Sequence, residues 1–96
     1  MITFITHLRV SPQNARAFEA AVAEMTRKVR ENEPGVAYYA LSRSGDDPQT
    51  YAVIEVYRDE AALEAHQRTD YFAPSLAQTT QLVEAGAFDI KRYVSP

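Results

Sequence analysis

Residues 51–72, YAVIEVYRDEAALEAHQRTDYF, read as a strand, a turn and a helix in direct succession. The side chains alternate between two faces from Tyr51 to Tyr57, which predicts a strand. The following turn leads into a short helix, for which Asp59 is the expected N-cap. His66 lies on the apolar face of that helix. We therefore expect the helix to hold a titratable group over the sheet to which the strand belongs.

Outside this stretch, the periodicity of the sequence predicts five more elements. Residues 2–10 alternate, and Ser11-Pro12 is a typical helix start that precedes apolar residues spaced three and four apart. The expected elements are, in chain order, a strand over residues 2–10, a helix from Pro12 to about Asn32, a strand from Val36 to Arg43, a helix that starts near Thr69-Asp70 and stops at Gly86, and a strand from Ala87 to Val94.

The resulting order, β-α-β-β-α-α-β, predicts an α+β fold in a single domain over residues 1–96. Helices on one face of a four-stranded antiparallel sheet make up the ferredoxin-like arrangement, here with the second helix split. The opposite face of the sheet is not clearly polar in the first three strands. Because monomers rarely expose so large an apolar face, we expect a homodimer in which two sheets pack together.

The composition excludes several kinds of protein. A net charge of −3 argues against a nucleic-acid partner, which requires clustered lysine and arginine. The sequence has no cysteine, so disulfides and thiolate metal sites are excluded. No apolar run approaches the ~18 residues of a membrane span, and no signal peptide is visible at the N-terminus. We therefore expect cytoplasmic residence and no association with a membrane.

Three segments of the chain together resemble the antibiotic biosynthesis monooxygenase family, which includes quinol monooxygenases and belongs among the dimeric α/β-barrel proteins. They are Glu33-Pro34-Gly35-Val36, the strand at residues 51–57, and residues 59–66 with Tyr71-Phe72 after them. The resemblance covers nearly the whole chain. It implies a dimer of packed sheets and cofactor-free chemistry, in which a phenol or quinol is deprotonated and its anion passes an electron directly to O₂.

The sequence departs from its haem-degrading relatives at two positions. Tyr57 stands where the family usually has tryptophan, and His7 matches the position where those relatives have asparagine on the first strand. With both positions changed, the resemblance does not extend to haem degradation. The fold alone does not determine which of the family's remaining activities a protein has.

His66 and His7 are the main catalytic candidates. A histidine in a pocket titrates near neutral pH and can act as a general base or hold a phenolate. The alternative for His66 is a structural histidine that bonds a neighbouring loop. His7 lines the pocket if its face of the strand looks toward the helices, and otherwise lies at the dimer interface. A metal cluster of His7, His66 and Glu55 is not favoured, because their spacing is not that of a metal site.

Aromatic side chains are the candidates for the wall of a substrate pocket. Tyr57 is expected to add a secondary polar group beside the histidines. Tyr38 and Tyr39 are adjacent on a strand, so they face opposite sides, and Tyr38 is taken as the one in the pocket. The expected substrate-binding residues are Tyr38, Phe18, Phe72 and Tyr71. Glu55 lies among apolar residues and needs a partner, for which Arg92 on the last strand is a candidate.

Three functions remain open from the sequence. The first is a cofactor-independent monooxygenase that acts on a small phenolic or quinol-type compound, with His66 as base or anchor. The second is a non-catalytic module that binds a small ligand, and the third is an isomerase of a small keto compound. Oxygen consumption distinguishes the first from the other two.

Overall fold

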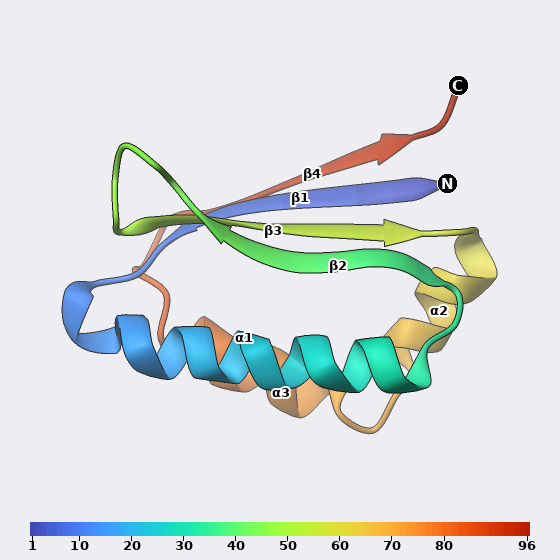
Figure 1. Ribbon diagram of the computed structural model, residues 1–96, viewed down its shortest axis with the longest axis horizontal. Coiled ribbons are helices and arrows are strands. Elements are labelled where there is room, and N and C mark those ends of the chain that lie inside the picture. The colour runs from blue at the N-terminus through green and yellow to red at the C-terminus, as the bar shows by residue number, and fades with distance from the viewer.

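A computed structural model describes all residues from 1 to 96 and places three helices on one face of a four-stranded sheet (Figure 1). The elements are β1 (Ile2–Arg9), α1 (Pro12–Asn32), β2 (Val36–Arg43), β3 (Thr50–Tyr57), α2 (Glu60–Gln67), α3 (Phe72–Thr80) and β4 (Phe88–Val94). The strands lie in the order β2-β3-β1-β4, and every neighbouring pair is antiparallel. The predicted ferredoxin-like α+β fold is confirmed.

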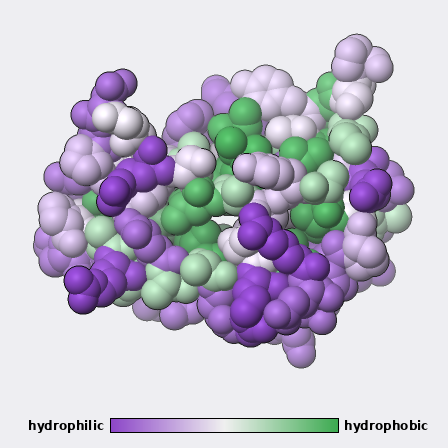
Figure 2. All heavy atoms as spheres, viewed as in Figure 1, coloured by the Kyte–Doolittle hydropathy of each residue, from purple (hydrophilic) through white to green (hydrophobic).

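The core lies between α1 and the face of the sheet that looks toward the helices. Its largest cluster joins β1, α1 and β3 and consists of Leu8, Val10, Phe18, Val22, Tyr51 and Val53. Hydrophilic side chains cover the outer side of the helical layer, and apolar ones gather along the strands (Figure 2). None of the helices is both long and apolar enough to cross a lipid bilayer.

The start of α2 is as predicted. The carboxylate of Asp59 accepts a hydrogen bond from the backbone N–H of Ala62 at 2.8 Å. This bond satisfies one of the amide groups that a helix N-terminus leaves without a partner. The expected cap therefore fixes where α2, the helix that carries His66, begins.

The prediction for α3 was wrong at both ends. The helix begins at Phe72 and ends at Thr80, well before Gly86. The hydroxyls of Thr79 and Thr80 bond to carbonyls one turn back, which competes with the regular pattern of the helix. The N–H of Glu84 then bonds the carbonyl of Arg9 at 2.8 Å. The chain therefore leaves the helix to follow the end of β1, and Gly86, with a φ of 76°, makes the turn into β4.

One irregularity near the start of β2 decides which side chains face the helices. Val36 pairs with Tyr57 and Tyr38 pairs with Val56, so Ala37 is an extra residue without a partner on β3. Such a bulge reverses the alternation of side chains beyond it. Val36 and Tyr39 therefore both face the helices, whereas strict alternation would have placed Tyr38 beside Val36.

Candidate functional site

A cavity of about 600 Å³ lies between the helical layer and the sheet. Its wall is largely apolar and includes Phe4, Leu8, Phe18, Val22, Met25, Val53, Leu63, Phe72, Leu76, Val83, Phe88 and Ile90. Its polar side chains are Thr6, Tyr39, Glu55, Tyr57, His66, Gln67, Ser75, Thr79, Thr80 and Glu84. A mostly apolar hollow of this size, with polar groups gathered in part of its wall, is typical of a small-molecule site.

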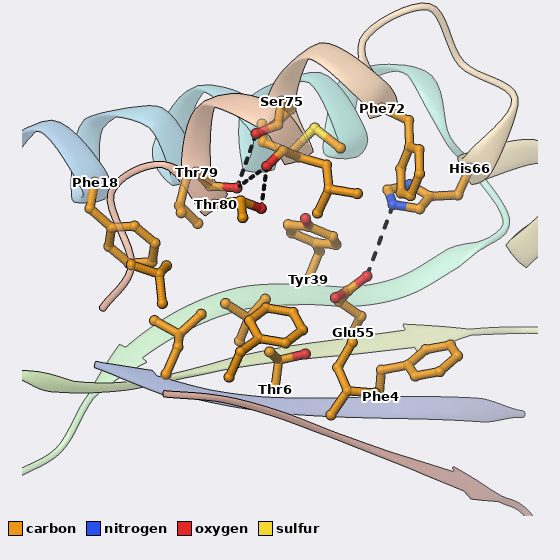
Figure 3. Close-up of a pocket in the computed structure, with 18 of the residues that line it drawn as sticks. Phe4, Thr6, Phe18, Tyr39, Glu55, His66, Phe72, Ser75, Thr79 and Thr80 are labelled. Atoms are coloured by element: carbon orange, nitrogen blue, oxygen red, sulfur yellow. Dashed lines mark hydrogen bonds and ion pairs between the residues drawn. The ribbon is translucent and has the colours of Figure 1, made fainter. Parts of the chain in front are cut away.

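His66 projects from α2 into this cavity, opposite residues of the sheet (Figure 3). Only 2% of the residue is exposed. Its ring packs among three aromatic side chains, with centroid distances of 5.9 Å to Tyr39, 5.3 Å to Tyr57 and 5.2 Å to Phe72. The imidazole is therefore held in one orientation by packing as well as by its polar contacts.

Two carboxylates flank the imidazole of His66. Nδ1 lies 2.8 Å from Oε1 of Glu33, and this hydrogen bond is deeply buried. The other oxygen of Glu33 accepts a hydrogen bond from the hydroxyl of Tyr71. On the cavity side, Nε2 lies 3.9 Å from Oε1 of Glu55, as the dashed line in Figure 3 marks. The histidine therefore has one tightly bonded nitrogen and one nitrogen near the cavity.

Glu55 is a mostly buried acid, with 19% of its side chain exposed. Burial raises the pKa of its carboxyl above the usual value, while the hydrogen bond from the Tyr57 hydroxyl and the nearby His66 oppose this shift. The expected ion pair with Arg92 was wrong. Arg92 instead pairs with Glu60 of α2 and lies over the ring of Phe4.

The buried tyrosines of the site are hydrogen-bond donors and not bases. Burial raises the pKa of Tyr39 and of Tyr57, and the negative charge of Glu55 adds to both shifts. Both phenols therefore keep their protons at neutral pH. Tyr39 can donate to a polar group of a ligand, whereas Tyr57 already donates to Glu55, and proton acceptance is left to His66 and Glu55.

The structure brings most of the predicted site residues together. His66, Tyr57, Phe18 and Phe72 all line the cavity. Tyr71 does not line it, and lies behind His66, where it bonds Glu33.

His7 and Tyr38 lie on the opposite face of the sheet from the cavity. His7 is exposed and pairs with Ala52 and Asp89, whereas its neighbours Thr6 and Leu8 line the cavity. Tyr38 is 51% exposed, because the bulge at Ala37 turns Tyr39 toward the helices in its place. His7 is thus separated from His66 and Glu55 by the sheet, and no group of three or more potential metal ligands is formed.

Sequence reasoning missed Glu33 and Tyr39 as residues of the site and favoured a structural ion pair over a catalytic role for Glu55. The Glu-Pro-Gly motif could have indicated Glu33, because Pro34 restricts the backbone of the glutamate that precedes it at the end of the helix. No signal in the sequence reports the bulge that selects Tyr39. Glu55 was visible as an acid in an apolar strand, but its closeness to His66 depends on how α2 packs.

No lysine or arginine lines the cavity, and its ionisable side chains are His66, Glu55, Glu84, Tyr39 and Tyr57. An anionic ligand would therefore meet no fixed positive charge there. The arrangement suits a neutral, largely apolar molecule with a weakly acidic hydroxyl or C–H group, which His66 or Glu55 could deprotonate.

Comparison with known proteins then places the chain. The sequence model of the antibiotic biosynthesis monooxygenase family matches residues 1–75. The chain belongs to this family. A Caulobacter crescentus structure described as a "putative antibiotic biosynthesis monooxygenase" shares 35% identity, covers 99% of this chain and 89% of its own, and superimposes with a TM-score of 0.90.

Two further proteins are more distantly similar to this chain. The Bacillus subtilis protein named "Putative monooxygenase YcnE" is 25% identical over 85 residues, which is 88% of each chain. Rv0793 from Mycobacterium tuberculosis is 22% identical and superimposes with a TM-score of 0.86 over 99% of this chain and 94% of its own, so it supports the fold alone. The family and the monooxygenase names of its members support a monooxygenase-like function for the chain.

Proposed function

We propose that the protein is a cofactor-independent monooxygenase that oxidises a small phenolic or quinol-type compound with O₂. The observation that supports this most directly is the buried imidazole of His66, which lies between two carboxylates. Its Nε2 lies on the side of the largely apolar cavity. A base held at such a cavity can accept the proton of a phenol that binds within hydrogen-bond reach of it.

The proposed reaction begins with transfer of the phenolic proton to Nε2 of His66. The resulting phenolate gives one electron to O₂, and the ring radical combines with superoxide to form a carbon–oxygen bond. Loss of water from this hydroperoxide leaves one oxygen atom on the ring. Overall, a quinol and O₂ yield a hydroxyquinone and water, and the substrate supplies all four electrons that O₂ accepts.

The cavity wall fits the substrate class of this reaction. Phe18 and Phe72 are placed to pack against an aromatic ring, as expected from the sequence. Tyr39 takes the place in the wall that was expected for Tyr38. Tyr57, the expected polar group, donates its hydroxyl to Glu55 beside His66. The lack of a lining cation favours a neutral substrate over a carboxylate or a phosphate.

Oxygen uptake with a panel of hydroquinones and anthrols tests the proposal. We expect at least one compound to consume O₂ in equal amount to the substrate, with one atom of labelled O₂ in the product. Added flavin or a chelator is expected to leave the rate unchanged. Binding of the panel without any turnover would contradict the proposal and identify a ligand-binding module.

An isomerase of a small keto compound is the second candidate, and one distance favours it. Nε2 of His66 and Oε1 of Glu55 lie 3.9 Å apart at the cavity, so one group could remove a proton and the other return it to a neighbouring atom. Turnover of an enolisable ketone without consumption of O₂ would favour this activity over the monooxygenase.

We also propose that the protein is a homodimer that packs through the face of the sheet without helices. This face presents Ile5, Ile54 and Val56 at its centre and the half-exposed phenols of Tyr38 and Tyr93 beside them. We expect sedimentation at micromolar concentration to give a dimer. A lysine in place of Ile54 should yield a monomer, because it would leave a buried charge in the interface.

The control for this substitution is Ala77→Lys, which adds the same charge at an exposed position of α3. It should leave the dimer intact. A wild-type monomer, or a dimer that survives Ile54→Lys, would contradict the proposed packing.

A further inference from the structure

The carboxylate of Glu33 is buried without a cationic partner. Only 7% of the side chain is exposed, and no lysine or arginine forms an ion pair with it. Its hydrogen-bond partners are Nδ1 of His66 and the hydroxyl of Tyr71. A buried carboxylate is costly unless its neighbours compensate the charge. The arrangement therefore relies on these two hydrogen bonds, one from the imidazole of His66 and one from the phenol of Tyr71, to compensate the carboxylate.

The backbone on both sides of Glu33 is anchored. The N–H of Glu33 bonds the carbonyl of Val29 at 2.9 Å and so closes the last turn of α1. Pro34 excludes the helical conformation at Glu33, which here has φ −123° and ψ 85°. The carbonyl of Gly35 accepts a bond from the N–H of Arg58 at 3.0 Å. Glu33 therefore presents its carboxylate from a fixed position between α1 and the end of β3.

Gly35 also determines how near α2 comes to Glu33. A Cβ atom built on Gly35 would lie 2.6 Å from the Cβ of Ala62, which is closer than real side chains approach. Ala62 is one helical turn before His66 on α2. The missing side chain at Gly35 thus lets α2 lie against the segment after α1, and this contact brings His66 within 2.8 Å of Glu33.

The two distances at His66 indicate which nitrogen carries the proton. A neutral imidazole has one N–H donor and one lone pair, and an ionised carboxylate only accepts. Glu33 lies within hydrogen-bond distance of Nδ1, whereas Glu55, at 3.9 Å, is beyond hydrogen-bond distance of Nε2. The proton of the neutral ring therefore belongs on Nδ1, and the lone pair on Nε2 faces the cavity.

We infer that Glu33 is the positioning residue of the site: it holds His66 in the Nδ1–H tautomer and stabilises the imidazolium that forms when Nε2 accepts a proton. Tyr71 supports this role, because it holds the second oxygen of Glu33 from outside the cavity. The tautomer is a property of the free protein. Only the effect of Glu33 on turnover rests on the proposed monooxygenase function.

Tyr71 can be altered without touching the cavity. It lines a separate groove between α1 and α3, where the ammonium group of Lys28 lies 5.7 Å from the centre of its ring. Tyr71→Phe removes the hydroxyl that bonds Glu33 and keeps the ring. We expect this variant to retain the Nδ1–H tautomer, since Glu33 stays beside His66, and to lower turnover less than removal of Glu33.

Nitrogen-15 NMR of the substrate-free protein, labelled at histidine, tests the inference directly. Free histidine in the same buffer serves as the reference for an unconstrained ring, because His7 lies on the sheet face that we propose to pair with a second copy. The chain has two histidines, so His7→Gln assigns the signals. We expect the neutral ring of His66 to show a protonated Nδ1 and an unprotonated Nε2. In Glu33→Leu, which cannot accept a hydrogen bond, the signals of His66 should shift toward the pattern of free histidine.

Steady-state kinetics add a second measurement. Glu33→Leu should lower kcat by about 10²-fold, because a base in the wrong tautomer cannot accept the proton, while KM changes by about twofold or less. A wild-type His66 with its proton on Nε2 would overturn the inference even if no variant folds. An unchanged tautomer in folded Glu33→Leu would overturn it as well. If the NMR result stands and no substrate turns over, the proposed reaction fails and the positioning role remains.

Discussion

Substitution of His66 by glutamine is expected to lower kcat/KM for a phenolic substrate by about 10²–10⁴-fold, the usual contribution of a positioned general base. Glutamine has a similar reach and remains polar, so it suits a buried position that already faces Glu33. It cannot accept a proton at neutral pH. The phenolate would then form only through Glu55, whose Oε1 lies on the cavity side of the imidazole.

The matched control for this prediction is His7→Gln, the same substitution on the other face of the sheet. His7 does not line the cavity, and glutamine keeps a polar side chain on the sheet face that we propose to pair, so the substitution should change kcat/KM by less than about twofold. Oxygen uptake of the three proteins over a range of substrate concentrations, with circular dichroism to confirm folding, gives the comparison. Equal rates for His66→Gln and the wild type would contradict the assignment of the base.

Gly35→Ala is expected to cost about 1–3 kcal/mol of unfolding free energy, the usual range for an overpacked contact. The new methyl group would meet the Cβ of Ala62 at 2.6 Å. Both atoms are fixed to their backbones, so neither can rotate away and α2 itself must shift. In a domain of this size, each kcal/mol lowers the Tm by about 4–8 °C. Because α2 carries His66, the bond to Glu33 should lengthen and turnover should fall together with stability.

Gly45→Ala provides the control for Gly35→Ala. Gly45 lies in the loop between β2 and β3, and a Cβ atom there would have no neighbour within 4 Å. Neither glycine has a positive φ, so backbone strain does not distinguish them. Thermal unfolding at one protein concentration should therefore show a lower Tm for Gly35→Ala only. Equal values for the two variants would mean that α2 does not depend on this close contact.

The fold could be predicted because most of its elements are specified by residues that lie close together in the sequence. The alternation of residues 51–57 and the side chain of Asp59 lie within a few positions of the structure they specify. The end of α3 depends instead on a distant contact, since Glu84 bonds the carbonyl of Arg9 at the end of β1. No sequence pattern between Phe72 and Gly86 predicts that bond. The helix was therefore predicted to be longer than it is.

The site could be predicted only in part for the same reason. His66 was identified from its place on the apolar face of a helix, and the wall residues Phe18 and Phe72 from their hydrophobicity. Glu33 precedes His66 by 33 residues, and their contact depends on the packing of α2 against Gly35. Their pairing was therefore not visible in the chain, although the Glu-Pro-Gly segment that permits it was.

The unpaired Ala37 in β2 is an insertion that the sheet tolerates without any change on either side of it. Removing that residue would restore regular pleating from Val36 onward and leave the later pairs as they are, so Tyr39 would still face the helices and Tyr38 the other side of the sheet. A strand one codon shorter can therefore present the same side chains to the cavity. An alignment with such a strand that left out the gap would assign the lining phenol to the wrong position.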